Sequence, residues 1–199
     1  MLEDIVIRRD GASVQATVYG ESDAGVILCP PHPLYGGNRF DARLVKIAEQ
    51  LVESDISAVA LDYHSYTGGH AEIADVLTVV SHFKGKMRSL GLLGYSYGSV
   101  VASNAAVKPR TKIKGLSLIS PIRAIDSMEL DLSSDCPKLM VYGRTDSLVA
   151  GDFDELYSKA KGEKEKLALD TDHFYGGVEE VLAMKVAQFF RRVLLAHQE

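Results

Sequence analysis

Apolar residues are spaced in two ways along this chain, and the two spacings alternate. Short continuous apolar runs between turn residues predict buried strands, and apolar residues three or four positions apart predict helices with one buried face. The predicted strands cover 25–29, 56–61, 90–93, 113–119, 138–142 and 167–169, and the predicted helices cover 40–52, 73–83, 100–107, 153–160 and 178–193. This alternation predicts an α/β fold, a three-layer α/β/α sandwich around a mainly parallel sheet.

The first residues follow a different pattern. Residues 5–8 and 13–19 alternate apolar and polar side chains on either side of Asp10-Gly11, which predicts an antiparallel N-terminal hairpin. A charged, alternating start is not typical of a signal peptide. Farther along, the charged segment 161–166 predicts a surface turn, and the segment 121–137 predicts irregular structure.

Composition narrows the class of protein. The 199 residues are 46% hydrophobic and 25% charged, which is typical of one globular domain spanning 1–199. The net charge of −5 argues against nucleic acid or an anionic membrane as the main partner. No apolar run approaches the roughly 20 residues of a membrane span. Cys29 and Cys136 are too few for a disulfide framework, so we expect reduced thiols in a cytoplasmic protein.

The run Gly94-Tyr95-Ser96-Tyr97-Gly98 joins a predicted strand to a predicted helix. A sharp strand-to-helix turn presents the serine hydroxyl to a substrate, and glycines on both sides remove side chains that would collide there. A hydroxyl in this position becomes a nucleophile once a base takes its proton. The same turn puts the Tyr97 amide at a helix N-terminus, where it can face a developing oxyanion. The pattern therefore predicts a nucleophilic Ser96.

A serine nucleophile needs a base, and the base needs an acid to orient it. Sites in parallel sheets lie at the carboxyl ends of the strands, and the chain order serine, acid, histidine is that of this architecture. Among the six histidines only His173, just beyond the last predicted strand, has this order, and Asp146 follows the strand before it. Asp172 adjoins His173 and points away from it in an extended segment, whereas Asp170 stays a geometrically conceivable alternative. We predict a triad of Ser96, Asp146 and His173.

The loop after the strand at 25–29 has an unusual composition. Residues 30–38 hold three prolines and two glycines, which predicts a specially shaped loop, and Asn38 is suited to cap the following helix. The chain resembles the alpha/beta-hydrolase superfamily, and within it the small cap-less proteins similar to dienelactone hydrolases that carry a His-Pro-x-x-Gly-Gly loop. The matching residues are the Ser96 turn, His32-Pro33-Leu34-Tyr35-Gly36-Gly37, Gly143-Arg144-Thr145-Asp146 and Asp172-His173-Phe174.

The resemblance covers nearly the whole chain and implies an alpha/beta-hydrolase fold without a cap domain. It implies the same three triad residues, and it places a second oxyanion-binding amide in the first loop, at Leu34 or, as the rival, at Tyr35. The chain departs from its relatives over 62–66, Asp-Tyr-His-Ser-Tyr, where they often carry an arginine and a glycine-rich turn. For this reason the resemblance assigns no substrate.

The predicted activity is hydrolysis of small to medium acyl esters or thioesters through an acyl-enzyme, with no cofactor. The segment 120–137 leaves no room for a folded cap. We therefore expect a shallow cleft, or one completed by a partner chain in a homo-oligomer. The expected walls of this cleft are Tyr35, Tyr66, Pro121 and Phe174.

Other interpretations stay open. The same triad serves peptide cleavage, carbon–carbon bond cleavage or perhydrolysis in other settings, and the fold can also act as a non-enzymatic interaction scaffold. A metal cluster of Asp62, His64 and His70 is disfavoured by its loop setting and its missing fourth ligand. Cys29 ends a buried strand, which favours a core position over a nucleophilic one.

Overall fold

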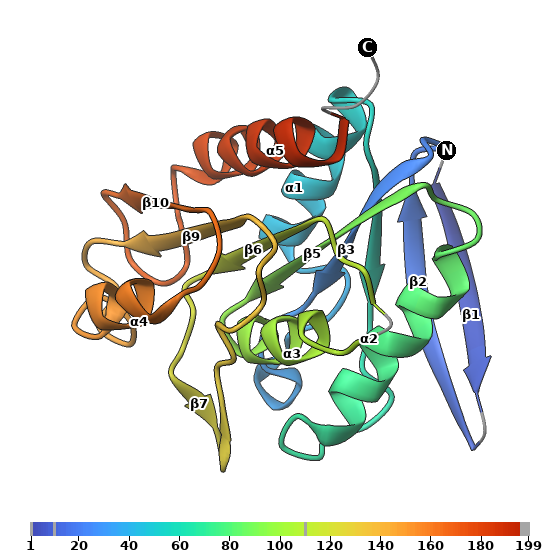
Figure 1. The fold of residues 1–199 in the computed structure, drawn as a ribbon, viewed down its shortest axis with the longest axis horizontal. Coiled ribbons are helices and arrows are strands. Elements are labelled where there is room, and N and C mark those ends of the chain that lie inside the picture. The colour runs from blue at the N-terminus through green and yellow to red at the C-terminus, as the bar shows by residue number, and fades with distance from the viewer. Residues whose placement is uncertain (1, 10, 110, 196–199) are drawn as a thin grey trace.

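The computed structural model describes residues 2–9, 11–109 and 111–195, and an eight-stranded sheet runs through its centre (Figure 1). The strand order is β1-β2-β4-β3-β5-β6-β9-β10, and all pairs from β4 to β10 are parallel. The strands are β1 Leu2–Arg9, β2 Ala12–Tyr19, β3 Ala24–Cys29, β4 Ser57–Leu61, β5 Ser89–Tyr95, β6 Gly115–Ile119, β9 Lys138–Gly143 and β10 Lys164–Leu169. The predicted α/β class, with its mainly parallel sheet, is confirmed.

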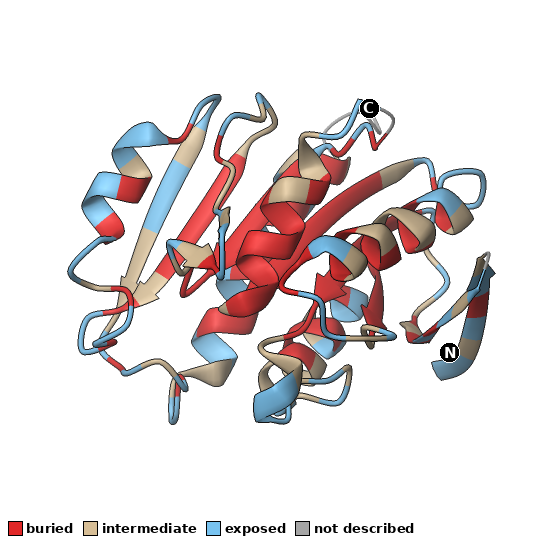
Figure 2. Cartoon of the chain, turned by 90° about the horizontal axis from the view of Figure 1, so that it is seen from below, coloured by how far each residue is buried: buried red, intermediate tan, exposed pale blue. Residues whose placement is uncertain are grey.

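Helices cover both faces of the sheet, as the alternating pattern predicts. One face packs against α2 His70–Phe83, α3 Tyr97–Ala106 and α4 Phe153–Lys159, and the other packs against α1 Ala42–Glu53 and α5 Glu179–Leu195. Figure 2 shows the buried residues gathered in the central strands and in the helices packed on them. Because β3, β4 and β6 are buried at every position, both of their faces must be apolar, which explains their continuous apolar runs.

The N-terminal hairpin extends one edge of the sheet. β1 pairs with β2 in antiparallel register, Leu2 facing Tyr19 and Arg9 facing Ala12, and β2 pairs with β4, also antiparallel. The alternating apolar residues are explained by this position, since one face of the hairpin packs on the core while the other meets solvent. The predicted turn consists of Asp10 and Gly11. Gly11 has a positive φ of 72°, and Asp10 lies outside the described residues.

Three local predictions need correction. Asp41, not Asn38, caps α1 by accepting a hydrogen bond from the Arg43 amide, while the Asn38 side chain binds Phe40 N and Gly36 O within the loop. The last strand begins at Lys164, inside the segment predicted as a turn. The segment predicted as irregular contains a small hairpin of β7 Ala124–Ile125 and β8 Met128–Glu129.

The charged start of β10 follows from its place at the edge of the sheet. Lys164 Nζ binds the carbonyls of Tyr157 and Ser158 in the last turn of α4 and that of Ala160 just after it. Lys166 pairs with Asp154 of the same helix at 2.8 Å. An edge strand keeps one side open to solvent, so charged residues fit there without a hydrophobic run.

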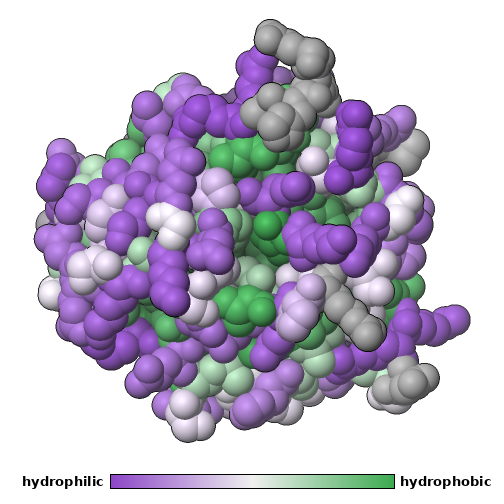
Figure 3. All heavy atoms as spheres, in the orientation of Figure 1, coloured by the Kyte–Doolittle hydropathy of each residue, from purple (hydrophilic) through white to green (hydrophobic). Residues whose placement is uncertain are grey.

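The parallel order brings five loops to one edge of the sheet, at the carboxyl ends of β3, β4, β6, β9 and β10, next to the turn between β5 and α3. The face of the molecule drawn in Figure 3 is mainly hydrophilic, with separate hydrophobic patches. Among the described helices, none is long and apolar enough to cross a membrane.

Candidate active site

Ser96 stands alone between two regular elements, after the last residue of β5 and before the first residue of α3. Its backbone has φ 54° and ψ −114°, a strained conformation for a residue with a side chain. The Ser96 amide donates to Ile119 O at 2.8 Å, which fixes the turn to the neighbouring strand β6. The sharp turn predicted from the glycine-flanked serine is therefore present.

Both flanking glycines are required by backbone contacts. A Cβ atom at Gly94 would lie 2.1 Å from Gly98 O, and one at Gly98 would lie 2.2 Å from Cys29 O. These neighbours are backbone atoms of packed elements, so they cannot move aside as a flexible side chain would. The two glycines let β5, α3 and the end of β3 approach closely enough to form the turn.

A chain of hydrogen bonds joins the three side chains of the predicted triad. His173 Nε2 lies 3.0 Å from Ser96 Oγ, and His173 Nδ1 lies 2.8 Å from Asp146 Oδ2. Ser96 and His173 are partly exposed, whereas Asp146 is buried. A substrate can therefore reach the hydroxyl while water is kept from the carboxylate.

Asp146 is held by more than the histidine. Ser120 Oγ donates to Asp146 Oδ2 at 2.7 Å, and the Leu148 amide donates to Oδ1 at 3.0 Å. Burial raises the pKa of the Asp146 carboxyl, but the hydrogen bonds from His173 and Ser120, the nearby histidine charge and the Leu148 amide outweigh burial. The pKa of Asp146 is consequently lower than its ordinary value. The site thus keeps an ionised acid beneath the imidazole.

The two acidic residues nearer to His173 in sequence have other partners. Asp170 is exposed and pairs with Arg144 at 2.9 Å. Asp172 accepts a hydrogen bond from the Phe174 amide at 2.8 Å, within the loop. Of these three carboxylates, only Asp146 has a hydrogen bond with the His173 ring.

A tyrosine beside the serine fixes the backbone of the histidine. Tyr95 OH donates to His173 O at 2.5 Å, and the two rings stack with centroids 5.6 Å apart. Arg43 of α1 donates to Tyr95 OH at 2.7 Å and lies over the Tyr95 ring. Nothing in the sequence pattern points to this arrangement, because Tyr95 also fits as a buried strand residue.

The amides predicted for an oxyanion hole lie on two elements. Tyr97 is the first residue of α3, so its N–H has no partner within the helix. In the first loop the Leu34 amide donates to His32 Nδ1 over a long 3.3 Å, whereas the Tyr35 amide donates to His32 O at 3.0 Å. The Leu34 amide is thus held less firmly than that of Tyr35.

The Tyr97 side chain is buried, and its hydroxyl belongs to a polar network. Its hydroxyl donates to Glu72 Oε1 at 2.7 Å, and Glu72 also accepts from Thr67 N, Thr67 Oγ1 and Gly69 N. Burial raises the pKa of Glu72, but these hydrogen bonds outweigh burial and lower its pKa below the ordinary value. Glu72 therefore ties the start of α3 to the loop after β4.

The four residues expected to line the cleft differ in how far they are exposed to solvent. The side chains of Tyr35 and Phe174 are exposed, at 87% and 66%, and Tyr66 is exposed at 36%. Pro121 is buried, so it offers little surface to a substrate. Leu148, two residues after Asp146, is also exposed, at 66%, and its amide binds the Asp146 carboxylate, although its loop position gave no separate signal in the sequence.

A second serine, histidine and aspartate lie together in the loop after β4. Ser65 Oγ is 3.0 Å from His64 Nε2, and His64 Nδ1 is 2.8 Å from the buried Asp75, which also pairs with Arg9 at 3.3 Å. Ser65 belongs to a loop and no helix starts directly after it, so this arrangement lacks the helix amide that Tyr97 supplies to Ser96.

Two of the three residues considered as metal ligands, Asp62 and His64, are engaged elsewhere. Asp62 pairs with Arg39, and His64 binds Asp75 as described above. Among the residues that the structure describes, no group of three or more histidine, cysteine, aspartate or glutamate side chains is arranged to hold a metal ion.

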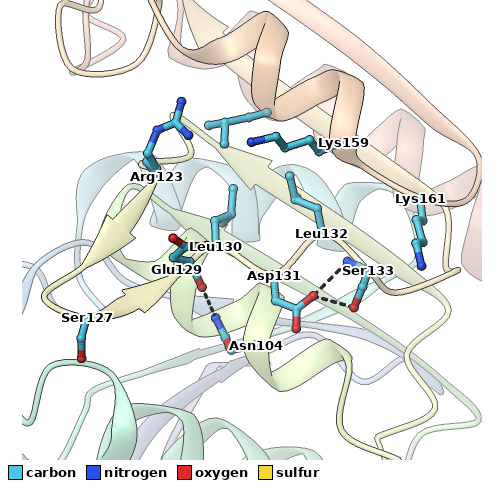
Figure 4. Close-up of a pocket in the computed structure, with 11 residues that line it drawn as sticks. Asn104, Arg123, Ser127, Glu129, Leu130, Asp131, Leu132, Ser133, Lys159 and Lys161 are labelled. Carbon is cyan, nitrogen blue, oxygen red and sulfur yellow. Dashed lines mark hydrogen bonds between the residues drawn. The ribbon is translucent and has the colours of Figure 1, made fainter.

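A separate hollow of about 560 Å³ lies beside the β7–β8 hairpin, α3 and α4 (Figure 4). Its charged groups are largely used internally, since Arg123 and Lys159 both bind Glu155 and Asp131 binds Ser133. Asn104 donates to the backbone of Glu129 at 2.9 Å. None of the three predicted triad residues lines this hollow.

Solved structures of the same architecture match almost the whole chain. An esterase of Pyrococcus furiosus is 19% identical with a TM-score of 0.84, over 98% of this chain and 92% of that one. A serine hydrolase without a lid from Xanthomonas campestris is 19% identical with a TM-score of 0.78, over 96% and 94%. A dienelactone hydrolase of Anabaena variabilis is 12% identical with a TM-score of 0.81, over 98% of both chains.

These likenesses establish the alpha/beta-hydrolase fold for this protein, in its compact form with no cap. The sequence itself matches no protein-family model and no curated protein.

Proposed function

We propose that this protein is a serine hydrolase that cleaves small to medium acyl esters or thioesters. The observation that carries the proposal is the hydrogen-bond chain from Ser96 Oγ through His173 to Asp146, with distances of 3.0 and 2.8 Å. The strained turn that exposes Ser96 supports the same reading, because strain of this kind persists where function requires it. Esterases and serine hydrolases among the solved structures of the same fold add support by analogy.

In the proposed reaction Ser96 Oγ attacks the carbonyl carbon while its proton passes to His173 Nε2. The proton then passes to the leaving oxygen as the carbon–oxygen bond breaks, which leaves an acyl-enzyme. Water repeats the two steps and releases the acid. Asp146 holds the imidazole in the tautomer with a proton on Nδ1 and stabilises the imidazolium that forms. The lowered pKa of Asp146 fits this role, since the carboxylate stays charged at neutral pH.

The oxyanion is proposed to bind between the amides of Tyr97 and Leu34. The Tyr97 N–H lies at the positive end of α3, where negative charge is favoured. Leu34 is preferred to Tyr35 because the Tyr35 amide already makes a 3.0 Å bond to His32 O, while that of Leu34 makes only the long contact to the His32 ring. Two preorganised donors of this kind supply a large part of the rate enhancement in acyl transfer.

A fluorophosphonate probe tests the nucleophile directly. The wild type is expected to gain one covalent label at Ser96, located by mass spectrometry of peptides, and to hydrolyse 4-nitrophenyl acetate. Ser96→Ala is expected to lose the label and to retain less than about a thousandth of the wild-type kcat. Its circular dichroism and urea unfolding report whether the fold is intact.

Ser65→Ala is the matched control, since Ser65 also has a histidine and an aspartate beside it but no helix amide next to it. It is expected to keep both the label and the activity. Loss of the label in Ser65→Ala, with retention in Ser96→Ala, would overturn the assignment. A chain that takes no label would favour a non-enzymatic scaffold, and labelling without ester turnover would favour peptide cleavage, carbon–carbon cleavage or perhydrolysis.

A further inference from the structure

Aromatic rings gather on the side of the Ser96 turn that faces the first loop. The His32 ring lies 4.6 Å from the Tyr35 ring, 5.2 Å from the Tyr66 ring and 4.7 Å from the Tyr97 ring, measured between centroids. His32 and Tyr66 are stacked with 25° between their planes, and Tyr66 lies 6.1 Å from Tyr97. We call His32, Tyr35, Tyr66 and Tyr97 the aromatic cluster.

The cluster presents ring surface to solvent, and hydrogen bonds hold two of its rings, Tyr66 and Tyr97. Tyr97 is buried, His32 is half-buried, and Tyr35 and Tyr66 are exposed. Tyr66 OH donates to Asp126 Oδ2 at 3.2 Å, which ties it to the turn of the β7–β8 hairpin. Burial lowers the pKa of His32 below its ordinary value, which favours the neutral ring. The exposed ring surface of Tyr35 and Tyr66 could therefore receive a planar, uncharged group.

The reaction geometry determines which part of a substrate meets the cluster. His173 Nε2 gives its proton to the leaving oxygen, so the leaving group lies on the side of His173. The oxyanion lies between the Tyr97 amide and the first loop, and Tyr97 and the first loop are also the elements that carry the cluster. The acyl group is bonded to the same carbon as the oxyanion, so it lies close to these elements and within reach of the aromatic cluster.

The loops around the site carry mainly negative charge, which disfavours a negatively charged substrate. The loops 30–41, 62–69, 120–137, 144–152 and 170–178 contain ten acidic residues, three arginines and no lysine. Each arginine is already paired: Arg39 with Asp62, Arg123 with Asp152 and Glu155, and Arg144 with Asp170. A carboxylate on the substrate would find no free cation in the described parts of these loops.

We propose that the acyl group of the substrate carries a neutral aromatic ring, which stacks on Tyr35 and Tyr66 of the aromatic cluster. This inference rests on the proposed function, because it assigns the acyl side of the same site. Arylacetic and related aryl-substituted esters are the chemical class that fits. Offset and edge-to-face ring contacts favour such a ligand over an alicyclic one of equal size.

Two matched esters test the proposal, 4-nitrophenyl phenylacetate and 4-nitrophenyl cyclohexylacetate. They share a leaving group and a methylene spacer, and each kcat/KM is divided by the rate constant for hydroxide hydrolysis of the same ester. The wild type is expected to favour the phenyl ester by about five- to tenfold. The 4-nitrophenyl ester of (4-carboxyphenyl)acetic acid is expected to react more slowly than that of (4-methylphenyl)acetic acid.

Variants test which residues cause the preference for the phenyl ester. The double variant Tyr35→Leu/Tyr66→Leu is expected to bring the phenyl-to-cyclohexyl ratio close to one, mainly through KM. Tyr66→Phe retains the ring and is expected to retain the ratio. Phe40→Leu removes an exposed ring of the same loop that packs over Arg39 outside the cluster, and it is expected to leave the ratio unchanged. A wild-type ratio near one, or a ratio that survives the double variant, overturns the proposal.

A binding measurement separates this inference from the proposed function. Ser96→Ala is titrated with phenylacetamide and with cyclohexylacetamide, and binding is followed by NMR. Tighter binding of phenylacetamide, lost in Ser96→Ala/Tyr35→Leu/Tyr66→Leu, supports the aromatic site even if the wild type hydrolyses no ester. Equal affinity for the two amides rejects the aromatic site even if Ser96 is the nucleophile.

Discussion

Ser120 donates a 2.7 Å hydrogen bond to Asp146 Oδ2, the same oxygen that accepts from His173 Nδ1. Ser120 follows β6 directly and has a positive φ of 44°, unusual for a residue other than glycine. Its hydroxyl also lies 2.9 Å from the buried Tyr175 OH. Asp146, the acid proposed for the triad, lies in the loop after β9, but Ser120, which helps to orient it, follows β6.

Replacing Ser120 by alanine is expected to weaken both the fold and the reaction. The buried Asp146 carboxylate loses a donor, so the free energy of unfolding should fall by about 1–3 kcal/mol. The imidazole is held less firmly, and kcat should fall about tenfold with little change in KM. Ser117→Ala is the control, because the Ser117 hydroxyl is buried in β6 and has no hydrogen-bond partner among the described residues. An unchanged kcat in Ser120→Ala would show that Ser120 does not position the acid.

The three aspartates around His173 should differ sharply in their effect on turnover. Asp146→Asn is expected to lower kcat by about 10⁴-fold, because an amide favours the wrong tautomer of the imidazole. Asp170→Asn and Asp172→Asn should each cost far less, since these carboxylates bind Arg144 and the Phe174 amide. Steady-state kinetics give kcat for all three variants on one ester and so identify which aspartate acts with His173. Near-normal turnover in Asp146→Asn, with collapse in Asp170→Asn, would transfer the role to Asp170.

The fold was largely predictable, because the pattern of apolar runs and apolar stripes follows from burial in a covered parallel sheet. The order of Ser96, Asp146 and His173 along the chain was enough to predict that they meet, although their catalytic role stays a prediction. Ser120 gave no such signal, since a serine after a strand is ordinary and its contacts arise only when β6 and β9 lie side by side.

Helix and strand ends were less predictable for a related reason. Asn38 and Asp41 are equally good cap residues in sequence. Asp41 pairs locally with Arg43, which is in turn held by a tertiary contact to Tyr95 OH. The first half of β10 is charged because its partners are the end of α4 and solvent, so no apolar run marks where the strand begins.

Glu72 should make stability depend on pH in the acid range. The pKa of Glu72 is lowered in the folded state, so its contribution is complete above the unfolded value near 4.3 and is lost as the pH falls through the folded pKa. At pH 7, Glu72→Gln is expected to lower the free energy of unfolding by about 1.5–3 kcal/mol. The difference from the wild type should shrink steadily below about pH 4.

Urea unfolding at several pH values measures this difference. Glu163→Gln serves as the control, because Glu163 is exposed, and it should follow the wild type throughout. A difference that stayed constant from pH 7 to pH 3 would mean that the charge on Glu72 is not what stabilises the loop.

Acyl chains of short or medium length should be the best linear substrates. The segment between β6 and β9 forms only the two-residue strands β7 and β8, so the cleft has no cap to enclose a long apolar chain. A series of 4-nitrophenyl esters from acetate to palmitate, kept below their aggregation concentrations, gives kcat/KM against chain length. A steady climb to the longest ester would contradict the expectation.

The close contact of Gly98 with the end of β3 bears on how this protein can diversify. A Cβ at Gly98 would lie 2.2 Å from Cys29 O and 2.6 Å from Pro30 O, so main chain meets main chain where the Ser96 turn adjoins the first loop. The approach of the Ser96 turn to the start of the first loop is therefore set by the backbone, whichever side chains surround it. In the proposed hydrolase, mutation of Tyr35, Tyr66 or Phe174 would change which substrate fits, while the main-chain contact between the Ser96 turn and the first loop stays in place. Selection for new substrates of the proposed hydrolase would therefore act on these side chains and leave the turn unchanged.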